Sequence, residues 1–393
     1  MIINKKRALA YTARCGAISP IVGADNIELM AVNGWNVIVK KGEFKEGDLC
    51  VYFEIDSKLP VREWSEFMLK KHYKVKTMKL NKFGVISQGL ALPLDVFDIK
   101  IPEEEGIDLT EKLDVVYSVD EDNKRKAEIT KYDKMRQRHL DLFKKNKLVK
   151  WLYKRMWGKK LLFIFLGKKR DSRTWPEWVV KTDEERCQNL PYLFPGDDTK
   201  WIVTEKIDGS STTFTMKRHK RKTEFYVCSR NVCFDKPEKA DRCYYETNIY
   251  LEMAEKYHIE EILQEILNDH NDELEFVTIQ GETYGKNVQN RDYGLDGHDF
   301  MAFNLILGYK NKEVIRMNSV QMRDYLHWYD IPCVPILDEE FTLPATCQEL
   351  LDYAASDVSR IDGGMREGIV LRTLDGKQSF KAVSNEFLLK YHS

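Results

Sequence analysis

The sequence predicts an α+β protein in which a small β-barrel at the N-terminus precedes a larger domain with mainly antiparallel sheets. Short strand-like stretches broken by glycine turns fill about the first 100 residues, and strand candidates outnumber helix candidates after residue 175. A length of 393 residues, at roughly 150 per domain, fits two or three domains. Hydrophobic residues make up 43% and charged residues 32%, which excludes a mainly disordered chain.

The N-terminal segment, residues 1–115, has the pattern of a barrel of the OB type. Three β-rich stretches follow turn signals or a basic segment, namely 35–39 after Asn33-Gly34, 48–55 after Glu46-Gly47, and 84–92 after the lysine-rich segment 70–82. An OB barrel commonly binds oligonucleotides, but the fold alone does not establish that function.

Residues 116–174 are expected to form a basic connector that is helical over 124–160. Between Lys124 and Arg173 the chain has 19 Lys or Arg and 4 Asp or Glu, although the net charge of the whole chain is −1. Two interpretations remain open for this surplus of positive charge. A solvated helical linker carries such side chains at its surface, whereas a nucleic acid strand would suit both the cations and the aromatic residues among them, Phe143, Trp151, Tyr153 and Trp157.

The remaining segment, residues 175–393, alternates strand and helix candidates. Strands are expected at 201–204, 212–216, 224–228, 276–281, 300–307, 368–372 and 378–381. Helices are expected at 240–257, 259–267, 317–328 and 346–355. An excess of strands interrupted by helices indicates an α+β domain with mainly antiparallel sheets.

Several features indicate an intracellular protein, cytoplasmic or nuclear, without a membrane partner. The longest apolar run, Leu161 to Leu166, has six residues, far fewer than the ~20 that cross a bilayer. The N-terminus lacks the apolar stretch of a signal peptide, and the eight cysteines are scattered. Cys228 and Cys233, with His219 nearby, form at most half of a metal site with poor spacing for zinc, so buried thiols are the favoured interpretation.

The segment Lys206-Ile207-Asp208-Gly209 places a lysine two residues before an aspartate, where a strand gives way to a glycine turn. A single copy of this pattern would be an ordinary surface turn. Five further patterns follow it in one order: Ser229-Arg230-Asn231, Gly281-Glu282-Thr283-Tyr284-Gly285, Met301-Ala302-Phe303-Asn304, Arg366-Glu367-Gly368-Ile369-Val370-Leu371-Arg372 and Ser379-Phe380-Lys381-Ala382-Val383-Ser384.

In order and spacing these six patterns resemble those of the covalent nucleotidyltransferases, and among them the RNA ligases of the T4 RNA ligase 2 type. Residues 18–28, 34–35 and 41–44 resemble the N-terminal OB module of the Deinococcus/Naegleria-type clade of these ligases. The resemblance implies a nucleotidyltransferase (adenylyltransferase) domain of the ATP-grasp-like DNA/RNA ligase kind over 175–393. It also implies ATP as cofactor and a monomeric protein.

The chemistry explains why a lysine is needed. Joining a 5′-phosphate to a 3′-hydroxyl requires a leaving group on the phosphate, and a lysine amine can carry AMP between two easier steps. We expect Lys206 to be this nucleophile, with its pKa lowered from about 10.4 by burial or a neighbouring cation. The resemblance assigns Asp208, Glu282 and Glu367 to a hydrated metal or the ribose, and carboxylates suit Mg²⁺ or Mn²⁺. Without the motifs, three acids around one lysine would be a salt-bridge network.

The resemblance implies four further roles. Phe303 corresponds to the aromatic residue that stacks on adenine, although such a phenylalanine is otherwise ordinary core. Arg230 is expected near the ribose or the incoming 5′-phosphate, where its planar donors suit an oxyanion. Lys381 matches the lysine that contacts the α-phosphate in catalysis. Glu205 is expected to accept a hydrogen bond from the adenine amino group.

Departures from the family pattern concern the second lysine of the last motif and the end of the chain. This chain has Val383 where T4-type enzymes have that lysine, so either Lys381 acts alone or another cation such as Lys390 supplies the charge. Capping enzymes and DNA ligases carry an OB domain after this motif, whereas this chain ends at Ser393. We therefore expect an ATP-dependent RNA ligase that seals 3′-OH/5′-phosphate nicks in RNA-containing duplexes. The alternatives are a non-catalytic RNA-binding protein or a GTP-dependent capping-type nucleotidyltransferase.

Overall fold

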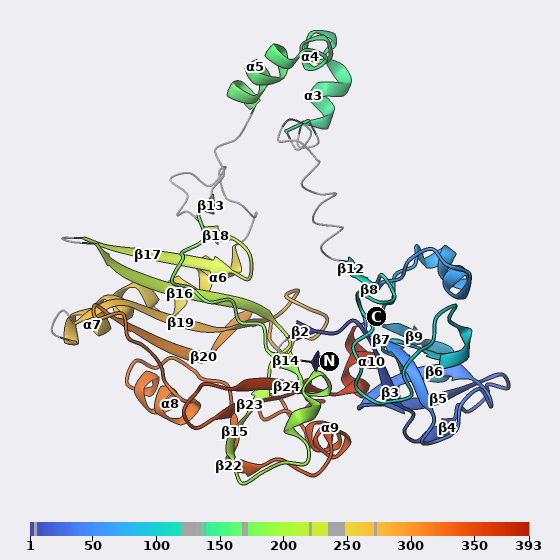
Figure 1. The fold of residues 1–393 in the computed structure, drawn as a ribbon. Helices are drawn as coiled ribbons and strands as arrows, with labels where there is room; N and C mark the ends of the chain where they lie inside the picture. Colours follow the sequence, from blue (N-terminus) through green and yellow to red (C-terminus); the bar gives the residue numbers. More distant parts are fainter. Residues whose placement is uncertain are drawn as a thin grey trace.

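The computed structural model describes residues 1–3, 6–118, 132, 135–136, 139–166, 172–219, 222–234, 248–270 and 273–392. Figure 1 shows three parts along the chain: an N-terminal β module, a group of short helices, and a larger domain of sheets and helices. The predicted fold class, an N-terminal OB-type barrel followed by an α+β domain, is confirmed.

The N-terminal module consists of short antiparallel strands. One sheet has the order β11-β7-β3, made of β3 (Ala10–Arg14), β7 (Leu49–Phe53) and β11 (Leu90–Pro93), and another contains β4 (Ile18–Pro20), β5 (Ile27–Val32) and β6 (Trp35–Lys40). Three further pairs are β1 (Ile2–Ile3) with β2 (Lys6–Arg7), β8 (Ser57–Lys58) with β12 (Val116–Tyr117), and β9 (Met78–Leu80) with β10 (Val85–Ser87).

The turn between β5 and β6 follows directly from the local sequence. Val32 pairs with Trp35, so Asn33 and Gly34 alone form the loop, with φ angles of 50° and 79°. Asn-Gly favours this two-residue turn because both positions need positive φ and the turn matches the twist of the strands. Trp35 is thereby placed in the buried core of the module, against the other strands.

The β-rich stretch at 84–92 forms two strands. It is divided between β10 and β11 at Gln88 and Gly89. The Gln88 amide donates to the Asn36 carbonyl at 2.7 Å, so the chain leaves one sheet and joins the next. Gly89 has φ 128°, and a Cβ there would overlap the Tyr52 hydroxyl, so glycine is required at this crossing.

The described part of the connector contains the short helices α3 (Leu140–Lys145), α4 (Lys147–Tyr153) and α5 (Met156–Leu166), in agreement with the helical prediction. Asn146 separates α3 from α4 and caps α4, because its side chain accepts from the amides of Leu148 and Val149. The helices share a small core of their own around Phe143, Val149, Tyr153 and Leu162. Residues 119–131 and 167–171, with much of the positive charge, lie outside the described residues.

The C-terminal domain contains two sheets. The seven-stranded sheet has the order β13 (Ser172–Arg173), β18 (Cys233–Phe234), β17 (Lys222–Ser229), β16 (Ser210–His219), β19 (Leu274–Gly285), β20 (His298–Tyr309) and β21 (Val314–Arg316). The five-stranded sheet has the order β14 (Glu185–Arg186), β24 (Ser379–Val383), β23 (Gly368–Thr373), β15 (Lys200–Lys206) and β22 (Ile336–Thr342). Among the described strands, only β14 and β24 pair in parallel, which confirms the mainly antiparallel prediction.

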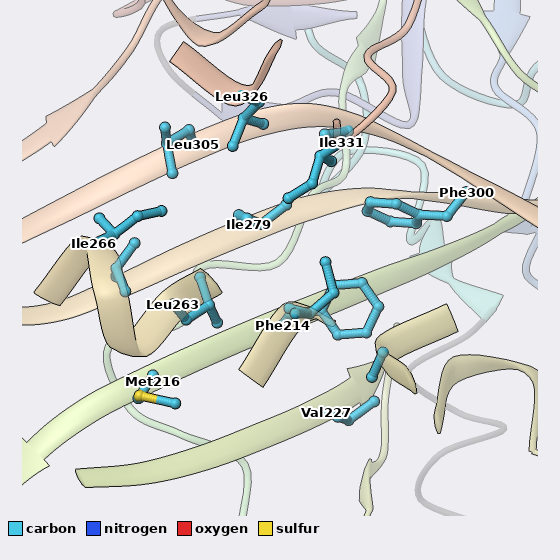
Figure 2. Close-up of a cluster of buried hydrophobic side chains, with 14 of the residues drawn as sticks. Phe214, Met216, Val227, Leu263, Ile266, Ile279, Phe300, Leu305, Leu326 and Ile331 are labelled. Atoms are coloured by element: carbon cyan, nitrogen blue, oxygen red, sulfur yellow. The ribbon is translucent and has the colours of Figure 1, made fainter. Parts of the chain in front are cut away.

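Helices cover the sheets through apolar faces with helical spacing. Leu263 and Ile266 of α7 (Ile259–Asp269) pack on Phe214 and Ile279 of the seven-stranded sheet, as Figure 2 shows. The same cluster receives α6 (Ile249–Lys256) and α8 (Ser319–His327). The five-stranded sheet is covered by α9 (Cys347–Ala355), and α10 (Asn385–Tyr391) follows its β24 strand.

Several elements differ from the sequence predictions. The helix expected at 240–257 is described only from Ile249, since residues 240–247 lie outside the described part of the chain. Neither β22 nor α10 was predicted. Cys228 and Cys233 face each other across β17 and β18 as buried, unbridged thiols, and neither belongs to a group of three or more His, Cys, Asp or Glu among the described residues that could hold a metal ion. No helix in the described residues is both long and apolar enough to span a membrane.

The N-terminal module packs directly against the five-stranded sheet and its helices. A Cβ on Gly34 would lie 3.0 Å from the Cys347 sulfur of α9, so the β5–β6 turn touches that helix. A second contact joins the module to α10, where Lys79 of β9 donates to the carbonyl of Leu388. The Arg186 guanidinium of β14 lies 5.6 Å from the centre of the Trp35 ring. The module therefore borders the edge of the sheet that carries the last motif.

Candidate active site

The motif Lys206-Ile207-Asp208-Gly209 lies where β15 ends and the chain turns into β16. A Cβ on Gly209 would lie 2.5 Å from the Thr283 carbonyl oxygen and 2.8 Å from Cγ of Glu282. Only glycine therefore allows β19 to approach this turn so closely. The close approach explains why the motif ends in glycine, and it brings Glu282 into the same cavity as Lys206.

The register of the five-stranded sheet gathers residues that are far apart in the sequence on one face. Thr204 of β15 pairs with Val370 of β23, and Val370 pairs with Lys381 of β24. Directly paired residues share a face of the sheet, so these side chains line one cavity. Its walls are formed by Thr182, Glu184, Thr204, Glu205, Lys206, Ile207, Glu282, Phe303, Val334, Val370, Arg372 and Lys381.

Lys206 is surrounded by the three predicted carboxylates. Its Nζ lies 3.0 Å from Oε2 of Glu367, and its side chain is 23% exposed. Burial acts to lower the pKa of Lys206, but the charges of Glu367, Glu282 and Asp208 outweigh burial and raise it above the ordinary value. The protein by itself therefore keeps this amine protonated, and the lowered pKa expected from the sequence requires a further positive charge.

The surroundings of the three carboxylates disfavour their ionised forms. Burial raises the pKa of Glu282 to about 8, with Glu367 and Asp208 adding to the effect and Lys206 opposing it. Burial also raises the pKa of Asp208 and of Glu367. The buried Asp208 and Glu367 and the partly buried Glu282 carry an excess of negative charge around one lysine, which favours binding of a cation.

The residues present fit a hard divalent cation. Oδ2 of Asp208 is buried and has no hydrogen-bond partner in the described structure, and Asp208 is only 5% exposed. Such an orphaned carboxylate oxygen is the kind of ligand that Mg²⁺ or Mn²⁺ prefers. Since these acids do not form a complete cage within the described residues, the remaining ligands would be water or phosphate oxygens.

Lys381, which lines the cavity, has a second cation beside it outside the lining. Arg186 of β14 pairs in register with Lys381 of β24, and its guanidinium lies near the Trp35 ring of the N-terminal module. Burial lowers the pKa of Lys381, and the charges of Lys206 and Arg186 lower it further. The Nη1 atom of Arg186 is buried without a partner in the described structure. Arg186 was not predicted, because β14 is a two-residue strand with no local signal.

The departure at Val383 has a structural context. Val383 pairs with Gly368 and is 2% exposed, so it belongs to the core. Lys390 lies on the exposed side of α10, outside the residues that line the cavity. Arg186 pairs with Lys381 across neighbouring strands, whereas Lys390 lies on α10. Arg186 is therefore the second cation beside Lys381.

Phe303 of β20 lines the cavity, and Arg372, which also lines it, binds the Phe303 backbone. Nη1 of Arg372 donates to the Phe303 carbonyl at 2.6 Å, and Nη2 lies 3.3 Å from Oε1 of Glu184. Arg372 is 4% exposed, and burial lowers its pKa. The sequence placed Arg372 in a motif without a role, and the structure shows it as the support of the Phe303 backbone.

Glu205 lines the cavity and also anchors a neighbouring loop, whereas Arg230 lies outside the cavity lining. Oε2 of Glu205 accepts from the Arg360 amide at 2.8 Å, so one of its oxygens anchors the loop before Glu367. Arg230 is 62% exposed and pairs with Asp183 at 2.6 Å. It does not line the cavity, although its charge acts on Glu282 from the rim.

A second group of residues holds the motif residues in place. The Tyr293 hydroxyl accepts from the Asp208 amide at 2.7 Å. Arg291, 4% exposed, pairs with Asp362 and donates to the Met365 carbonyl, which fixes the loop that leads to Glu367. From the C-terminal end, Nε2 of His392 lies 3.2 Å from Oδ1 of Asp208. None of these contacts has a local signal in the sequence.

Comparison with family models assigns both folded parts of the chain. A model described as RNA ligase matches residues 199–392, and a model described as an OB-fold domain matches residues 9–94. No curated protein sequence matches the chain at a significant level.

Solved structures of an RNA ligase from Naegleria gruberi are similar to the chain over nearly its whole length. The structure with PPi has a TM-score of 0.63 and 28% identity, and the match covers 98% of this chain and 99% of that one. A variant with ATP and Mn has a TM-score of 0.64 at 28% identity, covering 98% and 100%. An apo variant has a TM-score of 0.65 at 28% identity, covering 98% of each chain.

Proposed function

We propose that this chain seals 3′-OH/5′-phosphate nicks in RNA-containing duplexes through a lysyl-AMP intermediate, as an RNA ligase with an OB-fold domain in front. The matches of residues 199–392 to a model described as RNA ligase and of residues 9–94 to an OB-fold domain support the proposal. The observation that carries the proposal is one cavity in which Lys206, Lys381 and Phe303 meet Glu282. ATP-dependent ligation in the family and the ATP and Mn in the similar Naegleria structures support ATP and a divalent metal for this chain.

The first step makes the covalent intermediate. Lys206 Nζ attacks the α-phosphorus of ATP, a nitrogen–phosphorus bond forms, the bond to the β-phosphate oxygen breaks, and pyrophosphate leaves. Lys381 on the same face neutralises the charge that develops on the α-phosphate oxygens. Phe303, held by Arg372, offers an apolar surface for the adenine ring.

The carboxylates regulate the proton on the nucleophile. Asp208, Glu282 and Glu367 hold Lys206 protonated by themselves, because together they raise its pKa. A divalent cation bound by Asp208 and its neighbours would supply the positive charge that lowers this pKa and offsets charge on the phosphate. Adenylylation is therefore expected to depend on metal.

The second and third steps transfer AMP and release it. An oxygen of the RNA 5′-phosphate attacks the AMP phosphorus, and the nitrogen–phosphorus bond to Lys206 breaks. The 3′-hydroxyl then attacks the 5′-phosphate, and AMP leaves as the phosphodiester forms. Only the first step needs the lysine amine as a nucleophile.

Incubation of the pure protein with α-labelled ATP or GTP and Mg²⁺ or Mn²⁺ tests the proposal. We expect acid-labile label from ATP on the protein, its loss in Lys206→Ala, and residual sealing of a pre-adenylylated nick by that variant. Label from GTP alone would move the assignment to capping-type transfer. No label from either nucleotide would favour a non-catalytic RNA-binding protein.

A further inference from the structure

A second hollow, of about 980 Å³, lies on the N-terminal module, away from the candidate active site. One wall comes from the segment after β8, and the opposite wall comes from β10 and the start of β11. Three apolar side chains in its lining are unusually exposed: Val61 at 76%, Phe67 at 59% and Leu69 at 59%. Exposed apolar side chains grouped in one groove mark a binding surface more often than they mark ordinary surface.

Basic side chains predominate in the described lining of this groove. The lining residues that the structure describes include Lys58, Lys71, Lys74 and Lys76, together with His72, and no Asp or Glu is among them. The surrounding segment 70–82 has six lysines and no acidic residue. A groove with this composition attracts a polyanion and repels a cationic partner.

The backbone holds these lysines in a fixed arrangement. The Leu59 amide donates to the Tyr73 carbonyl at 2.9 Å, and the Val75 amide donates to the Ser57 carbonyl at 2.8 Å. Val75 is 2% exposed, so the neighbouring residues Lys74 and Lys76 point to the opposite side, as alternation along an extended segment requires. These two backbone hydrogen bonds therefore hold the segment that carries Lys74 and Lys76 against the chain around β8.

We propose that this groove binds an unpaired RNA strand that flanks the ends to be joined. Aromatic and apolar surfaces beside a row of cations suit a single strand, because bases can stack on a ring such as Phe67 while phosphates meet the lysines. A continuous duplex keeps its bases inside and would leave Phe67 and Leu69 without a partner. The proposal rests on the proposed ligase function for the identity of the strand.

The groove is linked to the candidate active site through one short helix. The β9–β10 hairpin forms part of its wall, and Lys79 of this hairpin donates to the Leu388 carbonyl of α10. Immediately after α10, His392 contacts Asp208 at 3.2 Å. A strand held in the groove therefore lies against the hairpin that contacts α10.

The test measures fluorescence anisotropy of the full-length protein with two nicked RNA duplexes, one blunt and one with an unpaired tail of about ten nucleotides, the scale of an OB-fold site. Phe67→Ala removes the stacking surface, and Lys71→Ala with Lys76→Ala removes two phosphate contacts. Lys41→Ala with Lys45→Ala is the matched control, since both are exposed lysines of the same module outside the groove.

We expect F67A to weaken binding of the tailed duplex about fivefold or more, the lower end of base–aromatic stacking, and to leave the blunt duplex unchanged. The lysine pair should reduce the slope of log affinity against log salt by about 1.4 for the tailed duplex, at ~0.7 for each single-strand contact. The control pair should not alter the preference for the tail.

The proposal is wrong if F67A binds the tailed duplex as the parent does, or if both duplexes lose affinity equally, which would indicate duplex contact. Adenylylation with labelled ATP serves as a separate readout of a folded active site in every variant. If the parent protein fails to adenylylate, the proposed ligase function fails, and the anisotropy comparison still decides whether the groove binds an unpaired strand.

Discussion

Replacing Arg372 by alanine removes the support beneath Phe303 and provides a quantitative test of the site. The variant loses a hydrogen bond from a charged donor to the Phe303 carbonyl, a contact that contributes about 1.5–3 kcal/mol. It also leaves Glu184, 18% exposed, without its arginine, and breaking a fully buried pair costs about 3–5 kcal/mol. Glu184 keeps the Ser379 hydroxyl as a donor, and the two losses are coupled, so we expect about 3 kcal/mol in total.

Urea unfolding and the ATP dependence of self-adenylylation measure the two consequences. The free energy of unfolding should fall by about 3 kcal/mol, and the ATP concentration for half-maximal labelling should rise because the Phe303 backbone is no longer fixed. Arg323→Ala is the matched control, since Arg323 also contacts two carboxylates, Asp324 and Glu339, but is 44% exposed and should lose no more than about 1 kcal/mol. A loss in R372A equal to that in R323A, with unchanged ATP dependence, would refute the reasoning.

Two further predictions concern charge. Burial raises the pKa of Glu282 to about 8 from 4.5 in the unfolded chain, so the folded protein binds this proton more tightly. The free energy of unfolding therefore falls progressively as the pH rises from 4.5 to 8 and the carboxylate ionises. In metal-free buffer, Glu282→Gln should therefore melt higher than the parent by a margin that grows over this pH window, and a constant margin would contradict the assigned pKa. In the connector, replacing Lys147 and Lys150 of α4 and Lys154 directly after it by alanine should reduce the salt slope of RNA binding by about 2 if these exposed side chains meet phosphates. An unchanged slope would favour a solvated linker.

The sequence predicts those parts of the structure that depend on neighbouring residues. The Asn33-Gly34 turn is an example, because two positive φ angles are needed and these two residue types accept them. The position of Lys206 at the end of β15 is another, since a β pattern runs directly into a glycine turn. Helices α7 and α9 were found because their apolar residues repeat with helical spacing over more than two turns.

The parts that the sequence did not predict depend on pairing between distant segments. Arg186 lies beside Lys381 only because the two-residue strand β14 pairs in parallel with β24, almost 200 residues later. Arg372 was visible in a motif, but its contact with the Phe303 carbonyl is set by the packing of one sheet on the other. The short helix α10 lacks enough turns for a clear period, so the approach of His392 to Asp208 had no sequence signal.

The carboxylates of the candidate site come from three different strand ends, and their convergence opposes folding. Asp208 follows β15, Glu282 lies in β19, and Glu367 precedes β23, yet all three act on the one amine of Lys206. A cavity selected for stability alone would replace buried like charges by apolar side chains of similar size. The chain instead uses glycine at 209 so that β19 can bring Glu282 closer. A site that is destabilising without a cation and balanced with one is the arrangement expected of metal-dependent phosphate chemistry, and it predicts that metal binding and fold stability are coupled.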